Sequence, residues 1–136
     1  MSVLDKTIGE GLKQGAFKII PTGRYVLRVV DYEVRKAGDK EVVDLKVKVV
    51  APLEDQDLSG INLDKARVRG SLWLTDNAMG PTTRAIRAIN PDVPETLSIR
   101  DSLELLTERD FGGVLVHSTR AGSDRVNVDV DKYFPL

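Results

Sequence analysis

The chain has 136 residues, of which 41% are hydrophobic and 30% are charged, and its formal net charge at pH 7 is −1. This length suits one domain around one hydrophobic core. No apolar run approaches the roughly 20 residues that cross a bilayer, which excludes a membrane protein. The absence of cysteine excludes disulfides and thiolate metal sites. The net charge argues against a uniformly basic surface, although a local basic patch is compatible with it.

The first 20 residues differ in pattern from the rest of the chain. Leu4, Ile8 and Leu12 recur at helical spacing, but three glycines in the same stretch weaken a helix. The stretch also lacks the basic start and apolar run of a secretion signal, so we expect the protein to stay where it is made, in the cytoplasm. We predict an N-terminal arm over 1–20 and a single domain over 21–136.

Two long strands are predicted next, over 23–36 and 40–50, joined by a turn at 37–39. In the first strand the apolar residues change parity, with Tyr25, Leu27 and Val29 on one side and Val30, Tyr32 and Val34 on the other. One inserted residue near Val29 or Val30, a β-bulge, would restore a continuous inner face. In the second strand Val43, Leu45, Val47 and Val49 alternate with outward Asp44, Lys46 and Lys48.

The stretch KARVRGSLWLTD, residues 65–76, follows an acidic, irregular connection over 53–64 and predicts a third strand. Arg67, Arg69, Ser71 and Trp73 share one face of it, whereas Val68, Gly70, Leu72 and Leu74 share the other. The only tryptophan of the chain therefore lies on the polar face. Gly70 is expected either to help the strand coil or to admit a close backbone approach.

A helical segment follows the third strand. Pro81 suits the first position of a helix that Asn90 and Pro91 end. A second helix is predicted from Ser98, which with Asp101 resembles a capping arrangement, and its buried stripe consists of Ile99, Leu103 and Leu106.

The last predicted elements are a strand that starts after Gly112 and Gly113 (VLVHSTR), a turn at 121–124 and a fifth strand (RVNVDVD). The glycine pair lacks the Lys of a phosphate loop and indicates a barrel corner instead. Three strands, a helical segment and a final hairpin are the arrangement of the OB-fold, an all-β, five-stranded Greek-key barrel. This fold binds oligomers on its second and third strands and on the loops joining strands one to two and four to five.

Basic residues gather in those elements. Exposed phosphates require Lys or Arg, and unstacked bases stack on aromatic rings. The candidate nucleic-acid-binding residues are Trp73, Arg67, Arg69, Lys46, Lys48, Arg35, Lys36, Lys40, Arg120 and Arg125. The alternative is that outward Lys and Arg only solubilise the sheet, and that Trp73 is covered by a helix or by the arm.

We expect no catalytic residue, metal or cofactor. His117, the only histidine, is expected to be an ordinary sheet residue. Asn127, Asp129 and Asp131 share a side of the last strand and could hold magnesium, but a solvated face is the simpler interpretation.

The segments PTGRYVLRVVDYEV, VVDLKVKVV, RVRGSLWL, DFGGVLVHS and VNVDVDKYFPL together resemble a known family. Their order, the Gly-x-Tyr opening, the Phe-x-Gly before the fourth strand, and Asn127, Tyr133 and Pro135 are similar to phage-encoded OB-fold single-stranded DNA-binding proteins. The resemblance covers about residues 17–136. It implies sequence-independent strand binding in DNA replication and recombination, in a bacterial host cell, with replication or recombination proteins as partners. Phe134 and Leu136 are expected to dock on the barrel or on a neighbouring subunit of a homo-oligomer.

Two functions follow from these patterns. The first is a non-enzymatic single-stranded DNA-binding protein. The second is a structural or adaptor protein of a phage particle, in which the same barrel binds protein. The near-neutral charge and the acidic 53–64 connection favour the second, whereas the placement of basic residues beside Trp73 favours the first.

Overall fold

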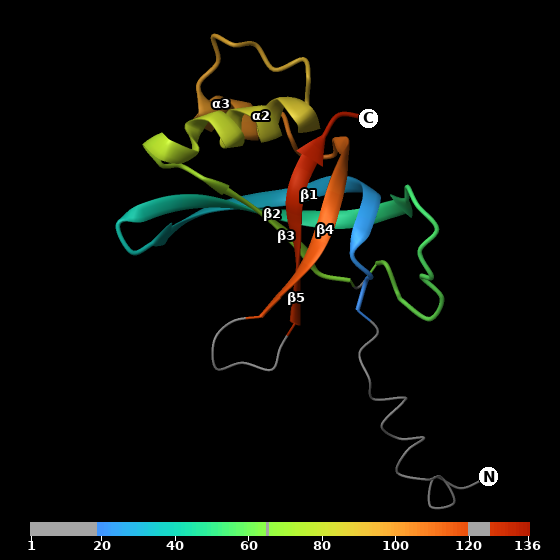
Figure 1. Ribbon diagram of the computed structural model, residues 1–136. Helices are drawn as coiled ribbons and strands as arrows, with labels where there is room; N and C mark the ends of the chain where they lie inside the picture. Colours follow the sequence, from blue (N-terminus) through green and yellow to red (C-terminus); the bar gives the residue numbers. More distant parts are fainter. Residues whose placement is uncertain (1–18, 65, 120–125) are drawn as a thin grey trace, which may run out of the picture.

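The computed structural model describes residues 19–64, 66–119 and 126–136. Five strands close into a barrel in the order β1-β2-β3-β5-β4 (Figure 1). Their bounds are β1 Gly23–Ala37, β2 Lys40–Pro52, β3 Val68–Trp73, β4 Asp110–Thr119 and β5 Val126–Phe134. β3 and β5 pair in parallel, and the other neighbours are antiparallel. The predicted five-stranded barrel with a helical segment between the third and fourth strands is confirmed.

β1 contains the predicted bulge. Its pairing with β2 shifts register between Val29 and Asp31, which leaves Val30 as the extra residue. Before the bulge β1 pairs with β2 on one side and with β4 on the other, and its inward residues are fully buried. After the bulge, β2 is the only described strand that pairs with β1, and β3 pairs with the other side of β2. This extension of the sheet projects to the left in Figure 1. The extension ends in a two-residue turn in which Gly38 takes a positive φ of 68°.

The third strand is shorter than predicted. Val68 is the first residue that pairs with β2, opposite Val47, and the strand ends at Trp73. Arg67 therefore precedes β3, and the chain turns toward the helices after Trp73. The connection over 53–64 contains no helix or strand, in agreement with the prediction.

The fourth and fifth strands extend further than predicted. β4 begins at Asp110, so Gly112 and Gly113 lie inside the strand and not before it. A Cβ on Gly112 would lie 2.0 Å from the Phe134 ring, and one on Gly113 would lie 2.5 Å from Cδ1 of Leu27. Glycine is needed because these side chains pack directly on the β4 backbone. Phe134 belongs to β5 and docks on the barrel, as one of the two alternatives proposed, whereas Leu136 is 67% exposed.

Side chains close the barrel between β3 and β5, which pair only at Val68 with Val128 and at Arg69 with Asp129. Beyond these pairs Tyr133 fills the gap and stacks on Phe111, with ring centroids 5.5 Å apart. A Cβ on Gly70 would lie 2.4 Å from the Tyr133 hydroxyl. The group that approaches Gly70 closely is therefore the Tyr133 side chain and not a backbone segment. Burial raises the pKa of Tyr133.

The segment between β3 and β4 contains a short 3-10 helix, η2 (Asp76–Ala78), and two helices, α2 (Met79–Ile89) and α3 (Ile99–Leu103). Pro81 is the third residue of α2 and not the first, but it still lies in the first turn, where amide groups have no helical partner. Asn90 follows the last residue of α2, and Ser98 caps α3 by accepting a hydrogen bond from the Asp101 amide (3.1 Å), both as predicted.

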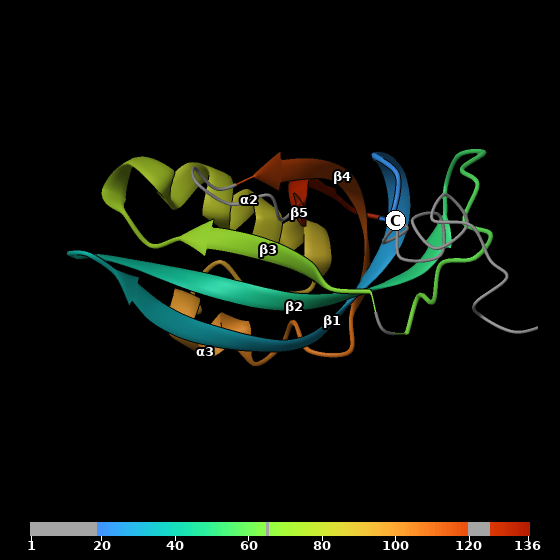
Figure 2. The same ribbon diagram turned by 90° about the horizontal axis from the view of Figure 1, so that it is seen from below.

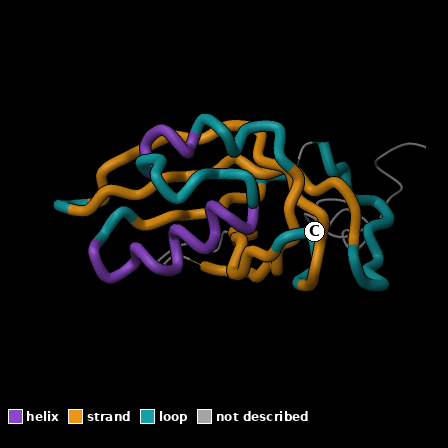
Figure 3. The backbone as a smooth tube through the Cα atoms, turned by 90° about the horizontal axis from the view of Figure 1, so that it is seen from above, coloured by secondary structure: helices purple, strands orange, loops and turns teal. Residues whose placement is uncertain are grey.

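Both helices cover one side of the barrel (Figure 3). Of the predicted stripe, Leu103 and Leu106 are buried, and Ile99 packs against the core while half-buried. Among the described residues, none of the helices has the length and apolar character that a membrane span requires.

Most of the predicted arm, residues 1–18, lies outside the described residues. Ile19 and Ile20 are described, and Ile20 is buried in the core. Ile20 therefore adds an apolar side chain to the core next to the first strand.

Candidate nucleic-acid interface

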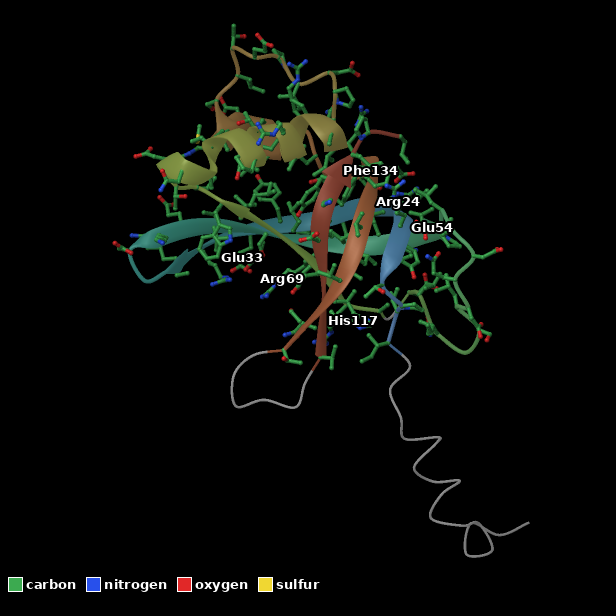
Figure 4. All side chains as sticks on the ribbon, in the orientation of Figure 1. Arg24, Glu33, Glu54, Arg69, His117 and Phe134 are labelled. Carbon is green, nitrogen blue, oxygen red and sulfur yellow. The ribbon has the colours of Figure 1, made fainter. Side chains whose placement is uncertain are left out.

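The cross-strand register arranges the outward side chains of β1, β2 and β3 in rows. From the turn of the extension toward the barrel, the rows are Arg35–Val42–Trp73, then Glu33–Asp44–Ser71, then Asp31–Lys46–Arg69. Asp129 of β5 continues the third row, opposite Arg69. Figure 4 shows Glu33 and Arg69 on the side of the sheet that faces away from the helices. We call Lys46, Lys48, Arg69 and Trp73 of these strands, together with the exposed Arg67 just before β3, the β2–β3 face.

Trp73 lies at the end of β3 and is 40% exposed. The predicted outward orientation of the ring is confirmed, and neither a helix nor the described part of the chain seals it. Its cross-strand partner Val42 is fully buried although it also points outward. Because its neighbours in the row are Arg35 and Trp73, we infer that these two side chains cover it. The indole therefore has one face toward the protein and one part open to solvent.

Three of the candidate cations are already engaged with carboxylates. Lys48 Nζ lies 3.0 Å from Asp64 Oδ1, Arg69 Nε lies 3.9 Å from Asp129 Oδ1, and Arg35 is ion-paired with Asp44. The most exposed of these pairs, Lys48–Asp64, belongs to a class that contributes about 0 to 1 kcal/mol, so Lys48 can exchange Asp64 for another anion. The Arg35–Asp44 pair is part-buried and less free to exchange.

Four other candidates make no ion pair with any described residue. They are Lys36, Lys40, Lys46 and Arg67. Arg120 and Arg125 lie outside the described residues. Lys36 and Lys40 flank the turn of the extension, beyond the row Arg35–Val42–Trp73. They therefore lie away from Lys46 and Arg69, the cations of the third row.

The charge on the outer surface is a strip and not a broad basic patch. Lys46 faces Arg69 directly across the β2–β3 seam, and Asp31 and Asp129 border this pair on either side. Like charges in directly opposed positions destabilise a sheet. A bound anion between Lys46 and Arg69 would relieve that repulsion.

Sequence reasoning missed one cation of this surface. Arg28 shares the outward parity of its strand and pairs in register with Lys48. Its Nε lies 2.6 Å from Asp110 Oδ1, and the guanidinium holds the pKa of that carboxyl below its usual range. Because Tyr25 and Leu27 point inward, the alternation of the strand predicts that Arg28 points outward, and this signal was present in the sequence.

The tyrosines of β1 are not part of the interface. Tyr25 is buried and its hydroxyl donates to the Pro21 carbonyl (2.7 Å). Burial raises the pKa of Tyr25, and Glu54 adds to the shift. Tyr32 packs against the core. Both lie on the inner parity, as the strand pattern predicted.

Two of the remaining polar residues singled out in the sequence, His117 and Asp129, have structural partners. His117 Nε2 lies 2.7 Å from the Ile20 carbonyl oxygen. Asp129 accepts a hydrogen bond from Ser118 Oγ. In the described ranges, no three acidic or histidine side chains are grouped so that they could hold a metal ion.

Comparison with known proteins adds no family assignment. Neither the protein-family models nor the curated proteins compared with this sequence gave a match.

Proposed function

We propose that this protein binds single-stranded DNA without reading its sequence, through the β2–β3 face. The observation that carries the proposal is the exposed indole of Trp73, on the same outer surface as Lys46 and Arg69. An aromatic ring offers a stacking surface to any base, and stacking contributes about 1 to 3 kcal/mol per base. The OB-fold commonly binds oligonucleotides on these two strands, which supports the proposal by analogy of fold alone.

The geometry of β3 suits a strand of linked bases and phosphates. Trp73 follows Arg69 by four residues, which corresponds to about 13 Å along an extended strand. The phosphates would take the place of Asp129 on Arg69 and of Asp64 on Lys48, and would lie between Lys46 and Arg69. Arg35, Lys36 and Lys40 of the first hairpin would hold the strand at one side.

The role that goes with this activity is non-enzymatic. The protein would protect single strands in the cytoplasm of a bacterial cell during phage DNA replication or recombination, beside the proteins of that process. This part of the proposal rests on the sequence resemblance.

Fluorescence tests the binding directly, because Trp73 is the only tryptophan of the chain. Titration with oligo-dT is expected to quench its emission, and the logarithm of the affinity should fall with the logarithm of salt concentration, with a slope of about −0.7 per phosphate neutralised. No quenching and no gel shift at low salt would refute the proposal.

Variants locate the site. Trp73→Ala should weaken binding of a labelled oligo-dT by about 1 to 3 kcal/mol in fluorescence anisotropy. Arg67→Ala should lower the salt slope, and Arg100→Ala, an exposed substitution on α3, serves as the matched control. If the Arg67 and Arg100 variants behave alike, the β2–β3 face is not the site.

One observation favours the alternative, a phage structural or adaptor protein. Val30 and Val34 of β1 are 47% and 45% exposed, although both are large apolar residues of a strand. Beyond Val29, β1 is an edge strand among the described strands, and exposed apolar residues on an edge strand are a typical site of contact with another protein. Under this alternative, oligo-dT would not bind, and purified phage particles or their subunits would bind the chain instead.

A further inference from the structure

The free edge of β1 leads to an inference that does not depend on DNA binding. β4 pairs with β1 only as far as Arg28, which is opposite Asp110. Val29 makes the last contacts on that side, donating to the Arg109 carbonyl (3.1 Å) and accepting from the Glu108 amide (2.7 Å). From Asp31 to Ala37, β2 is the only strand of the described chain that pairs with β1. Figure 2 shows β1 as the outermost strand of the extension.

The backbone groups that this edge presents can be identified. Val29 directs its N–H and C=O away from β2, and the bulge at Val30 moves the next residue of that kind to position 32. In agreement, the Tyr32 amide donates to its neighbour Asp31 Oδ1 (2.8 Å) and not to β2. Because antiparallel pairing alternates, Val34 and Lys36 direct their backbone groups outward as well. Unpaired groups of this kind are a template for another strand.

We propose that a second copy of this chain pairs with the edge, antiparallel and symmetric, with Val34 on the two-fold axis. In this register Val34 faces Val34 of the second copy, and Tyr32 faces Lys36. These are the residues with outward backbone groups, so the facing Val34 residues can exchange two hydrogen bonds, and each Tyr32–Lys36 pair can do the same once the Tyr32 amide leaves Asp31 Oδ1. The pairing uses the whole free segment and ends where Arg109 already occupies the edge.

The side chains are self-complementary in the same register. Glu33 faces Arg35 of the second copy, and the symmetry repeats this pair. In the single chain, Glu33 faces Asp44 across β2 and makes no ion pair with the described residues. Arg35 binds Asp44 through Nε, which leaves the terminal N–H groups of its guanidinium for Glu33. The exposed Val34 side chains meet at the axis and bury each other.

The symmetry has a geometric consequence. The two-fold axis is perpendicular to the sheet, so the outer surfaces of both copies lie on the same side of one continuous sheet. The order β3-β2-β1 followed by β1-β2-β3 of the second copy places the two β3 strands about 24 Å apart. The two Trp73 side chains would then lie on one surface.

Sedimentation velocity from about 10 to about 500 µM tests the pairing. The wild-type chain is expected to form a species of twice the 15.0 kDa monomer mass, in a concentration-dependent manner. Glu33→Lys should raise the dissociation constant at least about tenfold, because the introduced ammonium group would face Arg35 of the second copy. It should not destabilise the monomer, since it places a cation opposite Asp44. Asp131→Lys, an exposed charge reversal on β5, is the matched control and should leave the dimer intact.

A crosslink tests the register itself. The chain has no cysteine, so Val34→Cys would place one thiol beside the two-fold axis, and mild oxidation should join two copies. Val50→Cys, at an exposed valine of β2, should remain largely uncrosslinked at the same concentration. Val34→Pro removes an outward N–H without breaking a β1–β2 hydrogen bond and should give a folded monomer by circular dichroism.

A wild-type chain that stays monomeric at all concentrations would overturn the proposal and leave the edge to a strand of another protein. A dimer that Glu33→Lys does not weaken, or equal crosslinking of the two cysteine variants, would also overturn it.

Discussion

The two halves of β1 have the same alternation of residues but different surroundings. Gly23–Val29 lies between β2 and β4, so its inward side chains are buried and its backbone is paired on both sides. Among the described strands, Asp31–Ala37 pairs with β2 alone, and Val34 remains 45% exposed although it continues the inner face. The difference shows that a strand pattern specifies which face a residue occupies, whereas the number of neighbouring elements decides whether that face is buried.

The largest expected effect is in the barrel half of β1. Leu27→Ala should lower the free energy of unfolding by about 3 kcal/mol, because it leaves a cavity in a fully buried site. Val34→Ala, the matched change in the extension half, should cost less than about 0.5 kcal/mol. Urea denaturation of both variants measures the contrast, and equal losses would mean that the extension is as tightly packed as the barrel.

The second largest effect is expected at Gly112 of β4, on which Phe134 of β5 packs. Gly112→Ala should destabilise the protein by about 2 to 3 kcal/mol, because its Cβ would overlap the Phe134 ring. Thermal unfolding followed by circular dichroism measures the loss. An unchanged midpoint would show that the ring is free to shift.

A smaller loss is expected at the turn of the extension. Gly38→Ala meets no neighbouring atom, but the positive φ of 68° is unfavourable for alanine, so the cost should be about 1 kcal/mol. The same thermal measurement compares it with Gly112→Ala. If the turn variant proves the more damaging of the two, backbone strain outweighs overpacking in this fold.

The smallest effect concerns the Arg28–Asp110 pair, at the place where β4 leaves β1. The pKa of Asp110 is lowered in the folded protein, mainly by its hydrogen bond to Arg28. Its contribution to stability is therefore present above the unfolded pKa, about 3.9, and is lost as the pH falls through the folded value. Asp110→Asn should be slightly less stable than wild type at pH 7 and equal to it at the acid end. A difference that persists below both pKa values would rule out this charge as the cause.

Much of the fold was predictable because the signals are local. The change of parity at Val29 and Val30 indicated the bulge, Ser98 and Asp101 indicated a helix start, and the alternation over 67–74 put Trp73 outward. Each of these depends on residues within a few positions of one another, where the period of the backbone determines direction.

The pairing between distant segments was decided only by the tertiary structure. The β3–β5 register places Asp129 beside Arg69, and the 53–64 connection brings Asp64 to Lys48. Phe134 packs on Gly112, so that this glycine lies inside β4 and not before it, as the sequence had predicted. No local pattern specifies which carboxylate reaches which cation, because that choice depends on how the barrel closes. The sequence by itself therefore determined the strands, their faces and the candidate side chains. The closed barrel determined which of those side chains are already paired, and it left one edge of β1 open.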